Sequence, residues 1–249
     1  MSTLIIGNRS QLSYYLPKEY TRIPSRNIDY TLIKKKKWDR IYLCFAEQRT
    51  YLNEPLDFYT KINVDYTLEV LDKIRDHTRE VILFLTAELW NGYTGGVEFG
   101  MEMRHTETPY ILSKRMLYER VKDDPKVVMI FPFNFNSPHR DPNYLWGKII
   151  YSFTERKVVE VDCMDFSRDM IHPTSLANEI VKTEKHRIIG SGYLHNIRNL
   201  ARELFLSKNL DIDDYIKVKY EKCEDKPYYN MEKISDYLDI KKRTLYEYG

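Results

Sequence analysis

Four short apolar runs, each bounded by polar residues, constrain the fold of this chain most strongly. They have the length and branched content of buried strands, and they span Thr3–Ile6, Arg40–Ala46, Val81–Thr86 and Val127–Phe131. Helical patterns lie between them, because apolar residues recur at helical spacing in Asp57–His77 and again in 108–121. Strands that alternate with helices predict parallel βαβ units and a doubly wound sheet of the α/β class.

The bulk composition excludes several partners. Lysine and arginine number 39 and aspartate and glutamate 37, so the net charge of +2 gives no case for binding nucleic acid. No apolar run approaches the length that spans a bilayer, and the N-terminus lacks the basic region of a signal peptide. We therefore expect a soluble protein without a membrane partner.

The cysteines and histidines carry no sign of a metal site. Cys44, Cys163 and Cys223 are far apart and odd in number, and they match neither a disulfide framework nor a metal-binding spacing. This usage indicates a reducing compartment and a cytoplasmic location. The six histidines show no ligand spacing either, so we expect no metal.

The segment "LIIGNRSQLSYYL" predicts a strand, a turn and a short helix closed by Pro17. In a dinucleotide site such a turn carries glycines, so that the backbone can approach a pyrophosphate at a helix N-terminus. Only Gly7 is present, and Ser10 and Ser13 stand where the second and third glycines would be. The turn would bring to a cofactor site Gly7, Asn8, Arg9, Ser10, Gln11 and Leu12.

A second cofactor signal follows the next expected strand. A dinucleotide domain places its ribose-reading residue near the end of the second strand, where an acid favours NAD and an arginine accommodates the 2′-phosphate of NADP. Ser25 and Arg26 fit the second case, so the sequence favours NADP. A surface arginine in a turn is the alternative interpretation.

The stretch "TPYILSKRMLYERV", residues 108–121, places Tyr110 and Lys114 on one helix face. Reduction of a carbonyl needs a proton donor at the developing alkoxide, and a free tyrosine has a pKa near ~10. An adjacent ammonium stabilises the phenolate and moves that pKa toward the working pH. Thr86, at the end of an apolar run, could bond the same carbonyl oxygen. A bare Y-x-x-x-K also occurs by chance in ordinary amphipathic helices.

Five segments in order make the chain resemble the extended short-chain dehydrogenase/reductases of the NAD-dependent epimerase/dehydratase family. "NEPLDFYTKINVDYTLEVL" resembles the segment in which Asn-Val opens a helix, and Asn63 is the matching asparagine. "TPYILSK" resembles the active-site Y-x-x-S-K, and "VVMIFPFNFNSPHR" resembles R-P-F-N-x-Y-G-P. "RDMIHPTSLANEIV" and "IIGSGYLHNIRNLAREL" resemble R-D-x-I-H-V-x-D-x-A and the N-x-G-S-G stretch with its helix.

The resemblance implies a Rossmann fold with a small C-terminal substrate-binding part. Residues 1–135 would form the NADP-binding core, and 136–249 the remaining Rossmann elements and the substrate-binding region. Tyr110 would be the general acid and base, Lys114 would bind the nicotinamide ribose and lower the tyrosine pKa, and Thr86 would orient the carbonyl. Asn63 would contact the cofactor.

The resemblance also implies a nucleotide-sugar site. It would involve Glu88, Trp90, Asn134 and Arg168, with Arg168 at the diphosphate. In the structural alternatives, Asn134 bridges a loop and Arg168 pairs with Asp165 or Asp169.

Within the family the sequence favours 4-keto reductases of the dehydrorhamnose and GDP-fucose synthase types. Dehydratases carry T-D-E where this chain has Thr86, Ala87 and Glu88, so the acid that protonates the leaving hydroxyl is missing. The segment from Gly7 to Ser13 resembles the G-x-x-G-Q-L-G of dehydrorhamnose reductases.

We therefore expect NADPH-dependent reduction of a 4-keto nucleotide sugar for surface polysaccharide. A homodimer would form through Asp57–His77 and the helix that bears Tyr110. A 4-epimerase with retained NAD and a non-catalytic relative that binds NADP or a nucleotide sugar are the alternatives.

Overall fold

The computed structural model describes residues 2–104, 108–135, 137, 140–223 and 226–234, and the chain divides into two compact units. Unit 1 comprises Met1–Leu89, Met103–Pro132 and Ala177–Ile188. Unit 2 comprises Trp90–Glu102, Phe133–Leu176 and Ile189–Gly249.

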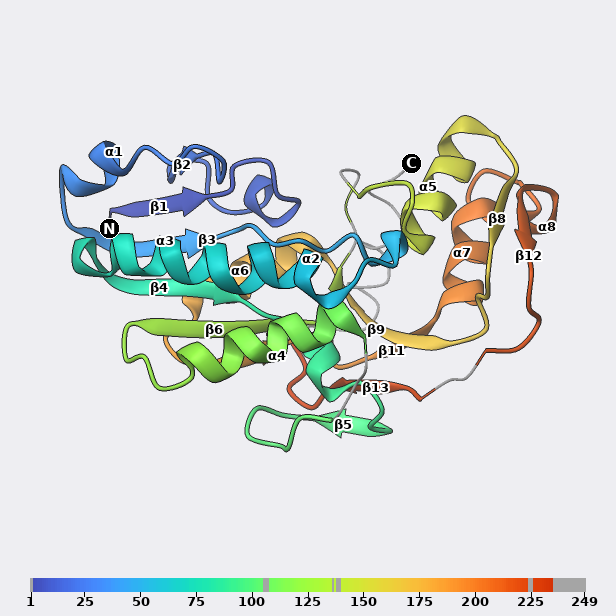
Figure 1. Cartoon of the computed structure of the whole chain (residues 1–249). Coiled ribbons are helices and arrows are strands. Elements are labelled where there is room, and N and C mark those ends of the chain that lie inside the picture. The colour runs from blue at the N-terminus through green and yellow to red at the C-terminus, as the bar shows by residue number, and fades with distance from the viewer. Residues whose placement is uncertain (1, 105–107, 136, 138–139, 224–225, 235–249) are drawn as a thin grey trace. The chain divides into compact units, whose positions relative to one another are not determined.

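Unit 1 is built on a sheet with the strand order β10-β6-β4-β3-β1-β2 (Figure 1), and the pairs from β2 to β6 are parallel. The strands are β1 (Thr3–Ile6), β2 (Thr21–Ile23), β3 (Trp38–Leu43), β4 (Thr78–Phe84), β6 (Val127–Pro132) and β10 (Arg187–Ile189). The central strands are buried along most of their length, which explains their continuous apolar runs. The four predicted strands are confirmed, with β3 and β4 placed slightly earlier than expected.

Helices cover both faces of this sheet, so the predicted doubly wound α/β fold is confirmed. The helical run after β3 contains α2 (Leu56–Thr60), the π-helical η3 (Lys61–Tyr66), α3 (Thr67–Ile74) and η4 (Arg75–His77). In Figure 1, α3 and α4 (Pro109–Val121) lie in front of the sheet, and α6 (Pro173–Lys182) lies behind it. The shorter helices of this unit are α1 (Tyr30–Lys34), η2 (Thr50–Leu52) and η5 (Ala87–Trp90), which runs into unit 2.

The first crossover departs from the prediction. The helix expected after the Gly7 turn is a single 3-10 turn, η1 (Leu12–Tyr14). The Arg22 guanidinium donates to the backbone carbonyl oxygens of residues 13, 16, 17, 18 and 20 at 2.8 to 3.3 Å. One arginine therefore satisfies carbonyls that a helix would otherwise pair, and an irregular segment takes the helix's place.

At its β2 edge, the sheet also has one strand fewer than the usual dinucleotide-binding sheet. Dinucleotide-binding sheets usually have the order 3-2-1-4-5-6, whereas the described strands of this sheet end at β2, beside β1. The first half of the fold is thus reduced to β1, β2 and short connections, and the second half, from β3 onward, keeps its strands and helices.

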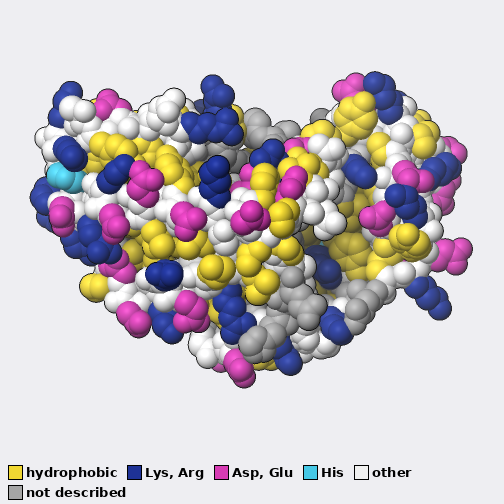
Figure 2. All heavy atoms as spheres, in the orientation of Figure 1, with side chains coloured by type: hydrophobic (Ala, Val, Ile, Leu, Met, Phe, Trp, Pro, Cys, Tyr) yellow, Lys and Arg dark blue, Asp and Glu magenta, His cyan; other side chains and the backbone are white. Residues whose placement is uncertain are grey.

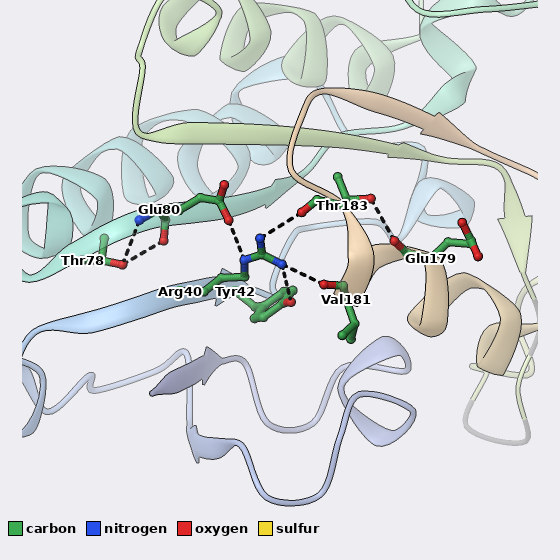
Figure 3. A network of polar contacts seen from close by, with 7 residues as sticks. All are labelled: Arg40, Tyr42, Thr78, Glu80, Glu179, Val181 and Thr183. Carbon is green, nitrogen blue, oxygen red and sulfur yellow. Dashed lines mark hydrogen bonds and ion pairs between the residues drawn. The ribbon is translucent and has the colours of Figure 1, made fainter. Parts of the chain in front are cut away.

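A buried arginine anchors α6 to the sheet (Figure 3). Arg40 on β3 donates from Nη1 to the Val181 carbonyl at 3.0 Å and from Nη2 to the Thr183 carbonyl at 2.9 Å. Its Nε lies 2.5 Å from Glu80 Oε2 on β4. The C-terminal carbonyls of a helix attract a cation, so Arg40 caps α6 and joins it to two strands.

Unit 2 contains a sheet ordered β11-β9-β7 and two parallel strand pairs, β8 with β12 and β5 with β13. The strands are β5 (Gly95–Val97), β7 (Asn134–Phe135), β8 (Val159–Val161), β9 (Ser167–Ile171), β11 (Leu194–Asn196), β12 (Ile216–Val218) and β13 (Tyr228–Asn230). The helices are α5 (Leu145–Glu155), α7 (Ile197–Leu206) and α8 (Ile212–Tyr215). Trp146, Phe153, Leu200 and Phe205 belong to the apolar core of this unit.

The expectation that the cysteines form no disulfide is wrong. Cys163 and Cys223 are bonded, with Cα atoms 6.1 Å apart and a sequence separation of 60. β8 and β12 pair just before these residues and bring them together, which sequence spacing could not show. Disulfides are typical of oxidising compartments, so the cysteines no longer support a cytoplasmic location. Among the described residues, no helix is long and apolar enough to cross a membrane.

We predict that Arg40→Met lowers the free energy of unfolding by about 3 kcal/mol, because Glu80 and the end of α6 lose a partner that is hard to replace in a buried site. Denaturant titration measures the change. Arg79→Met is the matched control, since the Arg79 side chain is 83% exposed and lies 3.6 Å from Asp39. Equal losses in the two variants would contradict the anchoring role.

His186 gives the fold a pH dependence. Its Nδ1 accepts a hydrogen bond from the Met129 backbone N–H at 3.0 Å, and burial lowers the pKa of His186 below its ordinary 6.5. The unfolded chain therefore binds this proton more readily, so stability is full above pH 6.5 and falls as the pH drops below it. Denaturation at about pH 8 and about pH 5.5 measures the slope, which His186→Gln should flatten. An unchanged slope would refute this account.

Candidate active site

The helix α4 carries the predicted Tyr110 and Lys114, as the sequence indicated. Pro109 occupies the first turn, where its missing N–H costs nothing, and Thr108 precedes the helix with extended backbone. Tyr110 is 9% exposed and Lys114 is 2% exposed, and the same helix buries Leu117. Both predicted reactive groups thus lie on the buried side of the helix.

Lys114 reaches the carboxyl end of β4. Its Nζ donates to the carbonyl oxygen of Phe84, the last residue of that strand, at 3.1 Å. Ligands of parallel α/β sheets bind beyond this end of the strands. Burial lowers the pKa of Lys114 from 10.5 to about 8, so the ammonium is close to releasing its proton near neutral pH.

Tyr110 is held by a second tyrosine that the sequence did not single out. The ring of Tyr59, from α2, meets the Tyr110 ring edge-on with centroids 6.2 Å apart. Tyr59 is itself buried, and its hydroxyl donates to the Arg49 carbonyl at 3.2 Å. The packing restricts the Tyr110 ring on one side, which favours a fixed direction for its hydroxyl.

Thr86 lies in the turn that follows β4, two residues after the carbonyl that binds Lys114. Its Oγ1 accepts the Glu88 backbone N–H at 3.2 Å and retains its own hydrogen for donation. Ala87 is 1% exposed, so the position that carries an acid in dehydratases holds a buried methyl group. The structure therefore brings Thr86 and Lys114 to the same strand end.

Asn63 is buried in the π-helical segment η3, and protein atoms engage its amide. Oδ1 accepts the Glu47 backbone N–H at 2.7 Å, and Nδ2 donates to the Glu47 carbonyl at 3.0 Å and to Ser113 Oγ at 2.9 Å. Ser113 in turn donates to the Tyr110 carbonyl at 2.7 Å. These contacts tie the loop after β3 to α4, and a cofactor contact by Asn63 stays a prediction.

The Gly7 turn follows β1 with the left-handed backbone that favours glycine, φ +108°. A Cβ at Gly7 would lie 2.3 Å from the Cys44 carbonyl oxygen, so packing against the end of β3 alone requires glycine here. Ser10 Oγ accepts the Ser13 backbone N–H at 3.2 Å. The turn keeps its shape without a helix behind it, and its residues Asn8, Arg9 and Gln11 stay predicted cofactor contacts.

Of the predicted substrate residues, Glu88 lies in unit 1, and Trp90, Asn134 and Arg168 lie in unit 2. Trp90 is buried, and its indole N–H donates to the Met101 carbonyl at 3.0 Å. Asn134 opens β7, and Arg168 lies on β9 with its guanidinium 4.6 Å from the Phe166 ring centroid. Their contacts with a substrate stay predictions.

The two acids considered as partners for Arg168 have other contacts. Asp165 lies 3.6 Å from Arg198 Nε. Asp169 is buried and accepts four hydrogen bonds, from the Ser191 N–H and hydroxyl and from the N–H groups of Gly192 and Asn230. Burial raises the pKa of Asp169, and these donors oppose the shift.

Residues 25–189 match the model of the NAD dependent epimerase/dehydratase family. The chain belongs to this family. Its members are enzymes of the extended short-chain dehydrogenase/reductase type, so the resemblance seen in the sequence is confirmed. The match begins after the Gly7 turn, which is the part of unit 1 that departs most from the usual fold. No curated protein matches the sequence.

Solved structures of low sequence identity share the fold. MoeE5 in complex with UDP-glucose and NAD has a TM-score of 0.77 at 12% identity, with 100% of this chain and 98% of that chain covered. A variant UDP-glucuronic acid 4-epimerase from Bacillus cereus, in complex with UDP-4-deoxy-4-fluoro-glucuronic acid and NAD, has a TM-score of 0.76 at 15% identity. The comparison covers 100% of this chain and 98% of that chain. RMD from Pseudomonas aeruginosa complexed with NADPH has a TM-score of 0.73 at 12% identity, with 92% of this chain and 89% of that chain covered.

We predict that Lys114→Met raises the free energy of unfolding at neutral pH by roughly 1–3 kcal/mol, because it removes a buried ammonium. In the native chain, stability should rise between pH 8 and 10.5, where the unfolded lysine still holds its proton; the variant should lack this rise.

Lys122→Met is the matched control, since Lys122 lies just beyond the same helix and pairs with Glu119 at 2.7 Å on the surface. Denaturant titration of the three proteins compares them. A loss of stability in Lys114→Met would contradict the strain ascribed to the buried charge.

Proposed function

We propose that this protein reduces the 4-keto group of a nucleotide sugar with NADPH. The observation that carries the proposal is the arrangement on α4. Tyr110 and Lys114 are buried on one helix, and the Lys114 ammonium lies at the end of β4, two residues before Thr86. This arrangement suits proton transfer to a carbonyl oxygen at the carboxyl edge of the sheet.

The proton chemistry follows from these three side chains. The Tyr110 hydroxyl gives its proton to the substrate oxygen as the carbonyl becomes an alcohol, and the Thr86 hydroxyl donates a hydrogen bond to the same oxygen. The Lys114 ammonium stabilises the phenolate that remains. With a pKa of about 8, Lys114 can then return a proton to Tyr110 near neutral pH.

The nicotinamide cofactor of the family supplies the hydride when it is bound. The residues at the nicotinamide end fit it, because Lys114 Nζ has three hydrogens and one goes to the Phe84 carbonyl, which leaves donors for ribose hydroxyls. Arg26 follows β2 and is exposed, which supports NADP over NAD. The preference for NADP and the roles of Ser25 and Arg26 belong to this proposal.

A nucleotide sugar as substrate is supported by the family and by relatives such as MoeE5, which is described in complex with UDP-glucose. In this proposal Arg168 pairs with the diphosphate, because a guanidinium bonds phosphate oxygens in pairs. Glu88, Trp90 and Asn134 complete the predicted contacts.

A 4-epimerase is the second candidate. The same three side chains would serve it, and the Bacillus cereus 4-epimerase shares the fold. A dehydratase is disfavoured by the buried Ala87. A purely binding role is disfavoured because a buried lysine opposes stability, and proton transfer gives it a use.

We also propose a homodimer, formed through α2, α3 and α4. Figure 2 shows apolar side chains among charges of both signs on the face that carries α3 and α4, and Met116 of α4 is 43% exposed. Exposed apolar side chains at such positions support an interface.

We predict that Tyr110→Phe lowers kcat by at least about 100-fold and changes KM little, because the ring still packs but no proton can be given. The decrease in NADPH absorbance during reaction with a panel of 4-keto nucleotide sugars measures kcat and KM.

Tyr118→Phe is the matched control on the same helix, where the ring packs against Phe131 with centroids 6.1 Å apart. It should keep full activity. Turnover of Tyr110→Phe at the native rate would overturn the proposed function.

A further inference from the structure

The hydroxyl of Tyr66 links the helical run after β3 to the segment that follows β2. Tyr66 is the last residue of the π-helical segment η3, and its hydroxyl donates to the Ser25 carbonyl oxygen at 2.5 Å. Ser25 follows β2, in the segment where a dinucleotide domain reads the adenosine ribose. The backbone of that segment is therefore fastened to the helix that follows β3.

The bond lies at the carboxyl edge of the sheet, because Ser25 follows the end of β2. In the sheet, β1 lies between β2 and β3. Neighbouring strands are about 4.8 Å apart, so the ends of β2 and β3 are separated by roughly 10 Å. Tyr66 bonds Ser25 beyond the end of β2 and contacts Phe45 beyond the end of β3, so it bridges the residues on either side of the carboxyl end of β1, where Gly7 forms its turn. The strand order reverses at this place, and dinucleotides bind in the crevice there.

A second aromatic ring fills the same place. Phe45 comes just after β3, and its ring centroid lies 5.5 Å from that of Tyr66. Phe45 and Tyr66 are both half-buried. Gly7 packs against the backbone of Cys44 and Phe45, so its turn lies against the strand end that carries the Phe45 ring. The chain's own side chains thus lie at the strand ends beside which a dinucleotide domain holds adenosine.

The pyrophosphate also lacks its usual support. A helix N-terminus normally faces the phosphates, and here the single turn η1 and the Arg22 hydrogen bonds replace that helix. The adenosine side of the site does not fit a dinucleotide held in the usual way, whereas the nicotinamide side fits.

We infer that Tyr66 is a specificity-determining residue that keeps the adenosine half of the cofactor outside the crevice, so that the dinucleotide is held mainly by its nicotinamide half and exchanges at every turnover. The inference rests on the proposed function and narrows it. A reductase must release its oxidised cofactor each cycle, whereas a 4-epimerase retains it, so loose binding favours the reductase. The protein should also be purified free of dinucleotide.

Titrations with NADPH, with reduced nicotinamide mononucleotide and with 2′-phospho-ADP-ribose test the inference by calorimetry, independently of turnover. Tyr66→Ala should tighten NADPH and 2′-phospho-ADP-ribose by at least about tenfold, which corresponds to about 1.4 kcal/mol. Tyr66→Phe keeps the ring, loses the bond to Ser25 and should give a smaller gain. Binding of the mononucleotide should stay the same in all proteins.

Tyr118→Ala is the matched control, because Tyr118 is also a half-buried tyrosine packed on a phenylalanine, Phe131. It should leave all three affinities unchanged. If Tyr66→Ala binds NADPH no better than the native chain while the mononucleotide still binds, this inference is overturned and the proposed function stands. If the mononucleotide binds none of the proteins, both are overturned.

Discussion

The buried ammonium of Lys114 is the constraint on which the rest of the site depends. Its Nζ donates to the Phe84 carbonyl at the end of β4, and this contact fixes α4 against the strand that ends near Thr86. Removing an ammonium from water is unfavourable, and one carbonyl offsets only part of that cost. This uncompensated cost of burying the charge lowers the pKa of Lys114. In the proposed reaction the lowered pKa has a use, because a lysine that is close to deprotonation can return a proton to Tyr110.

The two halves of unit 1 differ in how much regular secondary structure they contain. From β3 onward the sheet has its strands, its covering helices and a buried network through Asn63, Ser113 and the Tyr110 carbonyl. Before β3, an arginine-bonded irregular segment replaces a helix, and the sheet ends at β2. The family match begins at residue 25, after the irregular segment, and includes β3 and everything that follows it up to residue 189. The residues to which we assign the proposed chemistry, Thr86, Tyr110 and Lys114, therefore lie in the half that this chain preserves.

Much of this could be predicted from the sequence. Buried parallel strands are continuous apolar runs, so β1, β3, β4 and β6 and the helices between them were visible, and Y-x-x-S-K marked Tyr110 and Lys114. The Cys163–Cys223 disulfide could not be predicted, because it depends on the pairing of β8 with β12. The absence of a helix after Gly7 was also hidden, because "SQLSYYL" has a helical pattern and the competing Arg22 contacts come from a later strand. Tyr66 and Tyr59 look like ordinary helix residues until their partners are known.

The central claim is that Lys114 is buried as an ammonium with a lowered pKa, and direct titration of its side chain tests it. In protein labelled with carbon-13 at the lysine ε-carbon, the resonance absent from Lys114→Met identifies this residue. The account predicts that this resonance titrates with a midpoint near pH 8. A midpoint near the ordinary 10.5 would contradict it, because the ammonium would then be no less stable in the folded protein than in water.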